Sequence, residues 1–227
     1  MAGVLNRKSN FLFVHVPKTA GKSVEAMLLD LPGSAGVDLS YAEKARGQYA
    51  TTSYLERRLT RLSAIEKWTG ADRHSGRKQA MWAQLYKFCF VRHPVDRAIS
   101  AYRYCMRNSG DSSYRQPFGQ SLPAGLSFAE FIRLPRGYNY EVMNHFQIPQ
   151  SEYIRCADTA MDFVGKFENL DEDIAAVAEI LKLPLPQLER KNVSATDQNE
   201  IVPTAADLDL IAQCFAEDFA QFGYRTE

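Results

Sequence analysis

The chain has 227 residues and a formal net charge of zero, and 45% of its residues are hydrophobic against 24% charged. This is the balance of a folded, water-soluble domain, and it excludes a chain that is disordered throughout. Its apolar runs are too short for a secretory signal or a membrane span, which indicates a cytoplasmic protein; a catalytic domain cut from a longer membrane-anchored chain would show the same pattern.

Strands alternate with helices along the chain. Short apolar runs rich in β-forming residues predict three strands, at 11–16, 86–91 and 162–167. Helical spacing and capping residues predict helices at 21–31, 54–68, 75–85, 94–102, from 127 onward, at 169–182 and at 204–222. Segments 32–50 and 107–126 are rich in small and polar residues and are expected to be loops that together shape an acceptor cleft. The order predicts a single α/β domain over residues 1–227, with a central, mostly parallel sheet flanked by helices.

The first strand leads through the octapeptide VPKTAGKS into a helix. The start of a helix presents N–H groups without intrahelical partners and the positive end of the helix dipole, so it holds phosphate or sulfate readily. Gly21 lets the backbone approach an anion, and Lys18 or Lys22 adds positive charge. Thr19 and Ser23 supply hydroxyl donors. The octapeptide therefore predicts an anion-binding loop.

The nucleoside-triphosphatase loop GxxxxGK[ST] is the nearest comparison. Gly21, Lys22 and Ser23 match its end, but Val16 stands where its first glycine belongs. A plain turn joining strand to helix is the alternative interpretation.

Residues 90–102, FVRHPVDRAISAY, repeat the order of strand, turn and helix. Arg92 follows the strand end, where ligands gather in open parallel sheets. Ser100 lies two turns into the helix on a face that can look back toward that end. A guanidinium fork and a hydroxyl suit a phosphate dianion. Arg97 is expected to be structural, paired with Asp96 or with an acidic residue of the C-terminal half.

The charges also favour an anionic ligand in the first half of the chain. Residues 1–107 hold 18 Lys and Arg against 8 Asp and Glu, whereas residues 108–227 hold 9 against 19. Neutralisation of one half by the other would explain this distribution equally well. The basic residues form no continuous run, so nucleic acid is not an expected partner. The four cysteines are widely separated, which predicts neither a zinc site nor a disulfide framework.

At these two motifs the chain resembles the carbohydrate sulfotransferases that use 3′-phosphoadenosine 5′-phosphosulfate (PAPS). The likeness is greatest to the family of the heparan 2-O- and chondroitin 4-O-sulfotransferases and their small bacterial relatives. PKTAGKS resembles the 5′-phosphosulfate loop, and FVRHPVDRAISAY resembles the 3′-phosphate motif. The resemblance continues through 167–173, 191–194 and 218–224, and so covers nearly the whole chain.

The resemblance implies transfer of a sulfuryl group from PAPS to an acceptor hydroxyl, expected on a carbohydrate, without a metal ion. Lys18 would offset negative charge on the leaving phosphate. The implied nucleotide contacts are Lys18, Thr19, Ala20, Gly21, Lys22, Ser23, Arg92, Ser100, Lys191 and Ser194.

The reaction also needs a base for the acceptor proton, and histidine suits this near neutral pH. His74 resembles the residue on the base-bearing loop of related sulfotransferases. His15, inside the first strand and beside the anion loop, is the second candidate, followed by a carboxylate such as Glu25. His93 and His145 are expected to be structural.

Two other functions are consistent with parts of the pattern. A small-molecule kinase using ATP and magnesium would need the missing first glycine and an acidic metal ligand at a strand end. A nucleotide- or glycan-binding protein that kept the fold without catalysis would keep the same motifs.

Overall fold

The computed structural model describes residues 3–37, 65–66, 69, 76–108, 121–156, 159–184 and 200–226. The chain forms two compact units, each assembled from separate segments. The first comprises the described parts of Met1–Gly47, Leu59–Val91 and Glu152–Val193, and the second those of Gln48–Arg58, Arg92–Ser151 and Ser194–Glu227.

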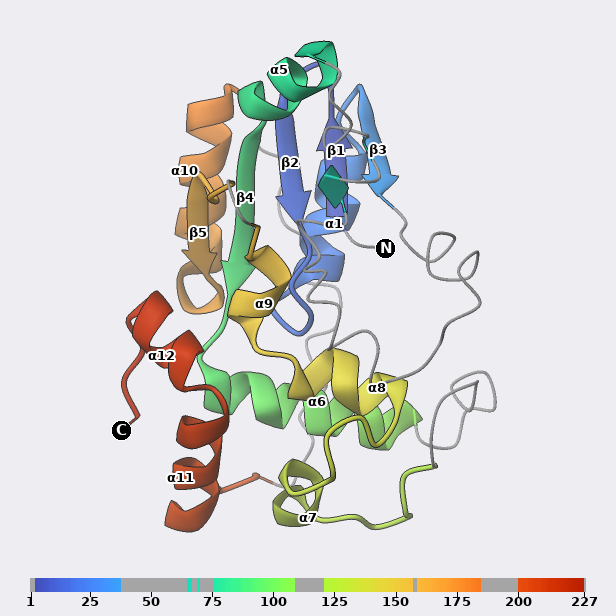
Figure 1. Ribbon diagram of the computed structural model, residues 1–227, viewed down its shortest axis with the longest axis vertical. Helices are drawn as coiled ribbons and strands as arrows, with labels where there is room; N and C mark the ends of the chain where they lie inside the picture. Colours follow the sequence, from blue (N-terminus) through green and yellow to red (C-terminus); the bar gives the residue numbers. More distant parts are fainter. Residues whose placement is uncertain are drawn as a thin grey trace. The chain divides into compact units, whose positions relative to one another are not determined.

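The first unit is built on a five-stranded sheet (Figure 1). Its strands are β1 (Gly3–Asn6), β2 (Phe11–Val14), β3 (Ser34–Val37), β4 (Tyr86–Val91) and β5 (Phe163–Lys166), in the order β3-β1-β2-β4-β5. β4 pairs in parallel with both β2 and β5, whereas β1 pairs antiparallel with β2 and β3. The α/β class and the three predicted strands are confirmed, but the sheet is mixed.

The antiparallel half of the sheet is what the sequence pattern missed. β3 has the sequence SAGV, whose small residues have low strand propensity, and it lies in the segment expected to be a loop. It forms because β1 offers an open edge, along which residues 34–37 pair with residues 3–6. The buried Asn6 side chain supports this arrangement, donating to the Pro32 carbonyl and the Ser34 hydroxyl.

Two helices pack against one face of this sheet. They are α1 (Gly21–Leu29) and α10 (Leu170–Leu181), and their apolar side chains form one buried cluster with the phenylalanines of β2 and β4. The helix α5 (Gly76–Gln84) precedes β4, and a short 3-10 helix at Phe167–Asn169 leads from β5 into α10. The helix α9 (Gln150–Ile154) precedes β5, and its first two residues belong to the second unit. α1, α5 and α10 lie where the pattern predicted helices. The predicted helix over 54–68 lies almost entirely outside the described residues.

The second unit is helical. It contains α6 (Pro94–Asn108), α7 (Phe128–Ile132), α8 (Tyr140–Val142) with a π-turn at Met143–Gln147, α11 (Ala205–Cys214) and α12 (Ala216–Phe222). The prediction of a single closing helix over 204–222 is wrong, because two helices, α11 and α12, occupy this segment. The backbone leaves helical geometry at Phe215, whose buried ring packs against Phe146 and below the Arg97 guanidinium.

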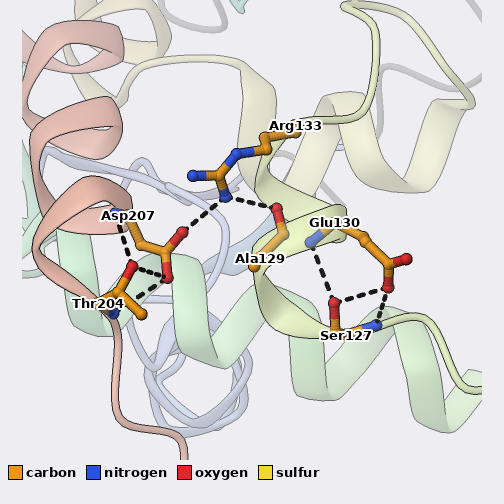
Figure 2. A network of polar contacts seen from close by, with 6 residues as sticks. All are labelled: Ser127, Ala129, Glu130, Arg133, Thr204 and Asp207. Atoms are coloured by element: carbon orange, nitrogen blue, oxygen red, sulfur yellow. Dashed lines mark hydrogen bonds and ion pairs between the residues drawn. The ribbon is translucent and has the colours of Figure 1, made fainter.

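Capping boxes start α7 and α11 (Figure 2). The first is the one predicted from sequence: Ser127 N donates to Glu130 Oε2 at 2.8 Å, and Glu130 N donates back to Ser127 Oγ at 3.2 Å. Thr204 and Asp207 repeat the pattern at 3.0 and 3.2 Å. Each box satisfies N–H groups that the helix leaves without partners.

Arg133 joins the two helices. Its Nη1 donates to Asp207 Oδ1 at 2.6 Å and to the Ala129 carbonyl at 2.7 Å (Figure 2). The Arg133 hydrogen bond is the main reason that the pKa of the Asp207 carboxyl lies below its usual value. None of the helices described has both the length and the apolar character that crossing a membrane requires.

Candidate functional site

Both predicted anion-binding elements begin where a central parallel strand ends. β2 and β4 are neighbours, with Val14 opposite Cys89, so their carboxyl ends lie at the same edge of the sheet. The chain passes from β2 into the octapeptide loop and from β4 directly into Arg92. Open sheets bind ligands beyond the carboxyl ends of parallel strands, so both elements start at a suitable edge.

The octapeptide loop has an unusual backbone. Lys18 and Ala20 adopt left-handed φ values of 71° and 63°, and Thr19 between them does not. A non-glycine residue held in this region costs roughly 1–3 kcal/mol, and such strain collects at functional sites. Alternation of this kind turns successive N–H groups toward one point, the arrangement of an anion-binding nest. Ala20 is also the N-cap of α1, so the helix dipole adds to the same field.

Thr19 stabilises this loop with its side chain. Its hydroxyl donates to the Val16 carbonyl at 2.9 Å, and the residue is 1% exposed. The hydroxyl hydrogen that was expected for a ligand is therefore engaged inside the loop, which leaves Thr19 its backbone N–H for that purpose. Lys18 is half-buried, Lys22 is exposed and Ser23 is buried in the first turn of α1.

His15 is packed into the same loop. Its Nδ1 lies 2.9 Å from Glu25 Oε1, with both side chains largely buried, and its ring stacks on Phe13. The other edge of the ring covers Gly21: a Cβ there would lie 2.1 Å from His15 Cδ2 and 2.2 Å from Nε2. Gly21 is thus required by the packing of the histidine ring. The structure brings the second and third base candidates together as a pair.

The turn after β4 is held by the end of the chain. His93 Nε2 lies 2.9 Å from the Arg225 carbonyl oxygen, and its ring meets those of Phe219 and Tyr224 edge to face. Arg97 is 2% exposed and donates from Nη2 to the Ile148 carbonyl at 2.9 Å. His93 and Arg97 therefore both make structural contacts, as expected. The contact described for Arg97 is a hydrogen bond to a backbone oxygen rather than an ion pair with an acid.

Arg92 and Ser100 are half-buried residues of the second unit. The main chain of Arg92 is hydrogen-bonded to the side chain of Gln150, a contact that sequence reasoning missed. No local pattern marks Gln150, because the two residues are 58 positions apart. His145 is structural: its Nδ1 lies 3.1 Å from Glu141 Oε2, and its ring packs on Tyr104 at 4.4 Å between centroids.

His74, Lys191 and Ser194 lie outside the described residues, so their roles stay predictions. In the described ranges, no three His, Cys, Asp or Glu side chains gather as a metal site would require. An apolar cavity lies between α1, β4 and α10, lined by Val24, Phe90 and Val177 among others. It contains none of the predicted site residues and belongs to the core.

Comparison with known proteins finds one family model that spans nearly the whole chain and several relatives that match parts of it. Residues 3–225 match the model of the "Sulfotransferase family". The chain is 34% identical over 111 residues to carbohydrate sulfotransferase 14 of Homo sapiens, covering 44% of this chain and 29% of that protein. It is 25% identical over 195 residues to carbohydrate sulfotransferase 14 of Danio rerio, covering 80% and 48%.

An uncharacterized protein of Archaeoglobus fulgidus is 33% identical over 110 residues, which cover 48% of this chain and 78% of that protein. The matches to the Homo sapiens and Danio rerio proteins each span less than half the length of those proteins. No solved structure matches.

Proposed function

The chain belongs to the sulfotransferase family, and we propose that it moves the sulfuryl group of PAPS to an acceptor hydroxyl of a carbohydrate. The carbohydrate sulfotransferases among its relatives support the acceptor class. The observation that carries the proposal is the strained loop after β2, whose alternating backbone suits an anion and whose sequence matches the family.

The residues present fit the two anionic ends of PAPS. The 5′-phosphosulfate is assigned to the loop: Lys18 and Lys22 provide positive charge, and Ala20, Gly21 and Ser23 lie at the start of α1. Any side chain at position 21 would collide with the His15 ring, so only glycine fits at this point of the loop. Thr19 contributes its N–H and the hydroxyl bond that holds the loop.

The 3′-phosphate is assigned to Arg92 and Ser100. A guanidinium with a hydroxyl gives charge-assisted hydrogen bonds to a dianion that ATP and ADP lack. Lys191 and Ser194 are assigned to the segment that closes over the nucleotide, as the family resemblance implies.

The chemistry assigned to this chain is charge stabilisation and proton removal. PAPS supplies the sulfuryl group: the sulfur–oxygen bond to its 5′-phosphate breaks as the bond to the acceptor oxygen forms. Lys18 stabilises the negative charge that develops on the bridging oxygen. His74 accepts the proton of the acceptor hydroxyl, and the products are the sulfated acceptor and 3′-phosphoadenosine 5′-phosphate (PAP). His15 is placed second as the base, because its Nδ1 already faces Glu25 and its ring covers Gly21.

The test is a comparison of nucleotides on the purified protein. Calorimetric titrations with PAP, ADP and ATP plus magnesium should show strong preference for PAP, and labelled sulfate should pass from PAPS to a glycan acceptor in the presence of a chelator. The migrating group of PAPS carries less charge than a γ-phosphoryl group, so Lys18 and backbone donors serve it without magnesium. Preference for ATP with magnesium would support the kinase instead, and PAP binding without transfer to any glycan would support the non-catalytic relative.

A further inference from the structure

The residue assigned to the 3′-phosphate has its backbone held from both sides by one buried side chain. Arg92 N donates to Gln150 Oε1 at 2.9 Å, and Gln150 Nε2 donates back to the Arg92 carbonyl at 2.8 Å. This is the pairing that a neighbouring strand would make, continued one residue past the end of β4. Gln150 is 0% exposed, so neither bond competes with water.

Gln150 is itself fixed by a second buried group. Asp218 of α12 accepts from Gln150 N at 2.8 Å and from Ser151 N at 2.9 Å, one bond to each carboxylate oxygen. Asp218 is also 0% exposed. A carboxylate that accepts two backbone N–H bonds at the start of a helix is held in place and holds the helix in return.

The residue after Arg92 is attached to the same part of the chain. His93 contacts the Arg225 carbonyl and the rings of Phe219 and Tyr224, which follow Asp218 closely in sequence. Two consecutive residues of the turn therefore depend on α12 and the tail behind it. Arg92 reaches α12 through Gln150, and His93 reaches it directly.

We propose that Gln150 and Asp218 are positioning residues for the 3′-phosphate, which set nucleotide selectivity by fixing the backbone of Arg92. This rests on the proposed function, since it assumes that Arg92 binds that phosphate. A guanidinium group binds a phosphate well only when the backbone of its arginine is fixed, because a long side chain on a mobile backbone loses more entropy on binding. Neither residue touches the nucleotide in this proposal; both act through Arg92.

The experiment measures PAP and ADP affinity by calorimetry on Gln150→Leu, which removes both bonds at similar volume. Expected is a loss of about tenfold or more in PAP affinity with ADP affinity little changed. The matched control is Gln147→Leu. Gln147 also bonds backbone on both sides, accepting from Gly137 N at 2.7 Å and donating to the carbonyls of Leu134 and Pro135. It should keep the PAP preference of the wild type.

A second variant keeps the test decisive if Gln150→Leu does not fold. In Gln150→Glu, an ionised carboxylate still accepts from Arg92 N–H, but its second oxygen has no hydrogen to donate to the Arg92 carbonyl oxygen and repels it. The protonated acid can both accept and donate, as the amide does. Its PAP-to-ADP preference, divided by that of the wild type at the same pH, should recover as the pH falls from about 8 to about 6, because burial raises the pKa of such a group. A purely structural contribution would not return with the proton.

The outcomes separate this inference from the function on which it rests. A wild-type preference for PAP that survives Gln150→Leu, or equal losses for PAP and ADP, would overturn the positioning role alone. Absence of PAP preference in the wild type would overturn the 3′-phosphate assignment, and the positioning role with it.

Discussion

The two turns assigned to the nucleotide are shaped in opposite ways. In the loop after β2, the contacts described join residues close in sequence: the Thr19 hydroxyl donates to the Val16 carbonyl, and His15 Nδ1 lies 2.9 Å from Glu25 Oε1, ten positions on. In the turn after β4, Arg92 bonds to a side chain 58 positions away and His93 to a carbonyl 132 positions away. Among the described contacts, those of the first turn are thus local, whereas those of the second turn reach residues far along the chain.

This difference predicts how each turn responds to mutation. Changes in the loop should weaken the binding of every nucleotide that places an anion at the 5′ side. Changes in the turn at Arg92 should weaken binding of the 3′-phosphate alone. Substitutions at distant residues of α9 and α12 should have the same effect.

The largest expected effect tests whether the loop supplies only shape or also the base. A positioned base contributes about 10²–10⁴ in rate. His74→Ala should lose turnover on that scale with unchanged PAP affinity, whereas His15→Ala should weaken PAP and ADP alike. Steady-state kinetics and calorimetry on both variants measure this. An active His74→Ala beside an inactive His15→Ala that still binds PAP would move the base into the loop.

The next largest effect is expected from replacing Lys18. This substitution distinguishes the contribution of the Lys18 side chain from that of the loop backbone. Lys18 sits at φ 71°, a conformation that glycine adopts without strain, so Lys18→Gly removes the ammonium while keeping the turn. Turnover should fall by about 10²–10³, the usual loss when a charge-stabilising donor is removed. PAP should still bind. Turnover within a few-fold of the wild type would transfer the catalytic role to Lys22, whose variant Lys22→Ala is the parallel control.

Arg92 should affect one nucleotide only. Arg92→Ala removes charge-assisted hydrogen bonds that the 3′-phosphate alone receives, so PAP affinity should fall by about 10- to 100-fold while ADP affinity stays. A two-by-two titration of wild type and variant with both nucleotides measures it. Equal losses for the two nucleotides would show that Arg92 supports the fold or the 5′ side, and the contrast between the two turns would disappear.

Gly21 should affect both nucleotides, through His15. In Gly21→Ala the new Cβ would lie 2.1 Å from the His15 ring, so the ring or the loop must move, and we expect PAP and ADP affinity to fall together by about tenfold. The same substitution on a His15→Ala background should cost little more than His15→Ala alone, because the colliding ring is absent. Additive losses would mean that the glycine serves the anion rather than the histidine.

The same division explains what the sequence could predict. β2, β4, β5, the start of α6 at Pro94 and the Ser127 capping box follow from local patterns, and the structure confirms them. β3 was missed because its pairing with β1, rather than its composition, makes it a strand. The helix break at Phe215 was missed because it depends on a ring packed against Phe146.

The candidate site divides in the same way. The loop after β2 could be proposed from eight consecutive residues, although its alternating φ values could not. The support of Arg92 by Gln150 and Asp218 could not be proposed, because no short-range signal connects three residues so far apart. A polar side chain buried in the fold is recognisable only once its partners are known.

The smallest effect concerns stability, at a residue that combines a local and a distant contact. Asp207 belongs to the capping box of Thr204 and also accepts from Arg133, 74 positions away. The Arg133 side chain is 45% exposed, so solvent screens that pair and its contribution is small. Thr204→Ala should therefore lower the free energy of unfolding by about 1 kcal/mol, and Arg133→Met by less. Urea unfolding measures both, and the reverse order would show that the distant contact dominates here too.

The pH dependence of the same carboxyl gives an independent check. The folded-state pKa of Asp207 lies below the unfolded value of about 3.9, first because of the Arg133 hydrogen bond and then because of those from Thr204. A carboxyl of this kind stabilises the fold above its unfolded pKa, and the contribution is lost as the pH falls through the folded pKa. Asp207→Asn should thus be less stable than the wild type at neutral pH, with the gap narrowing below about pH 4. Arg133→Met should reduce the narrowing, because it removes the largest cause of the lowered pKa. A gap that is constant from neutral to acid pH would show that Asp207 acts only as a hydrogen-bonding cap and that its charge contributes nothing to folding.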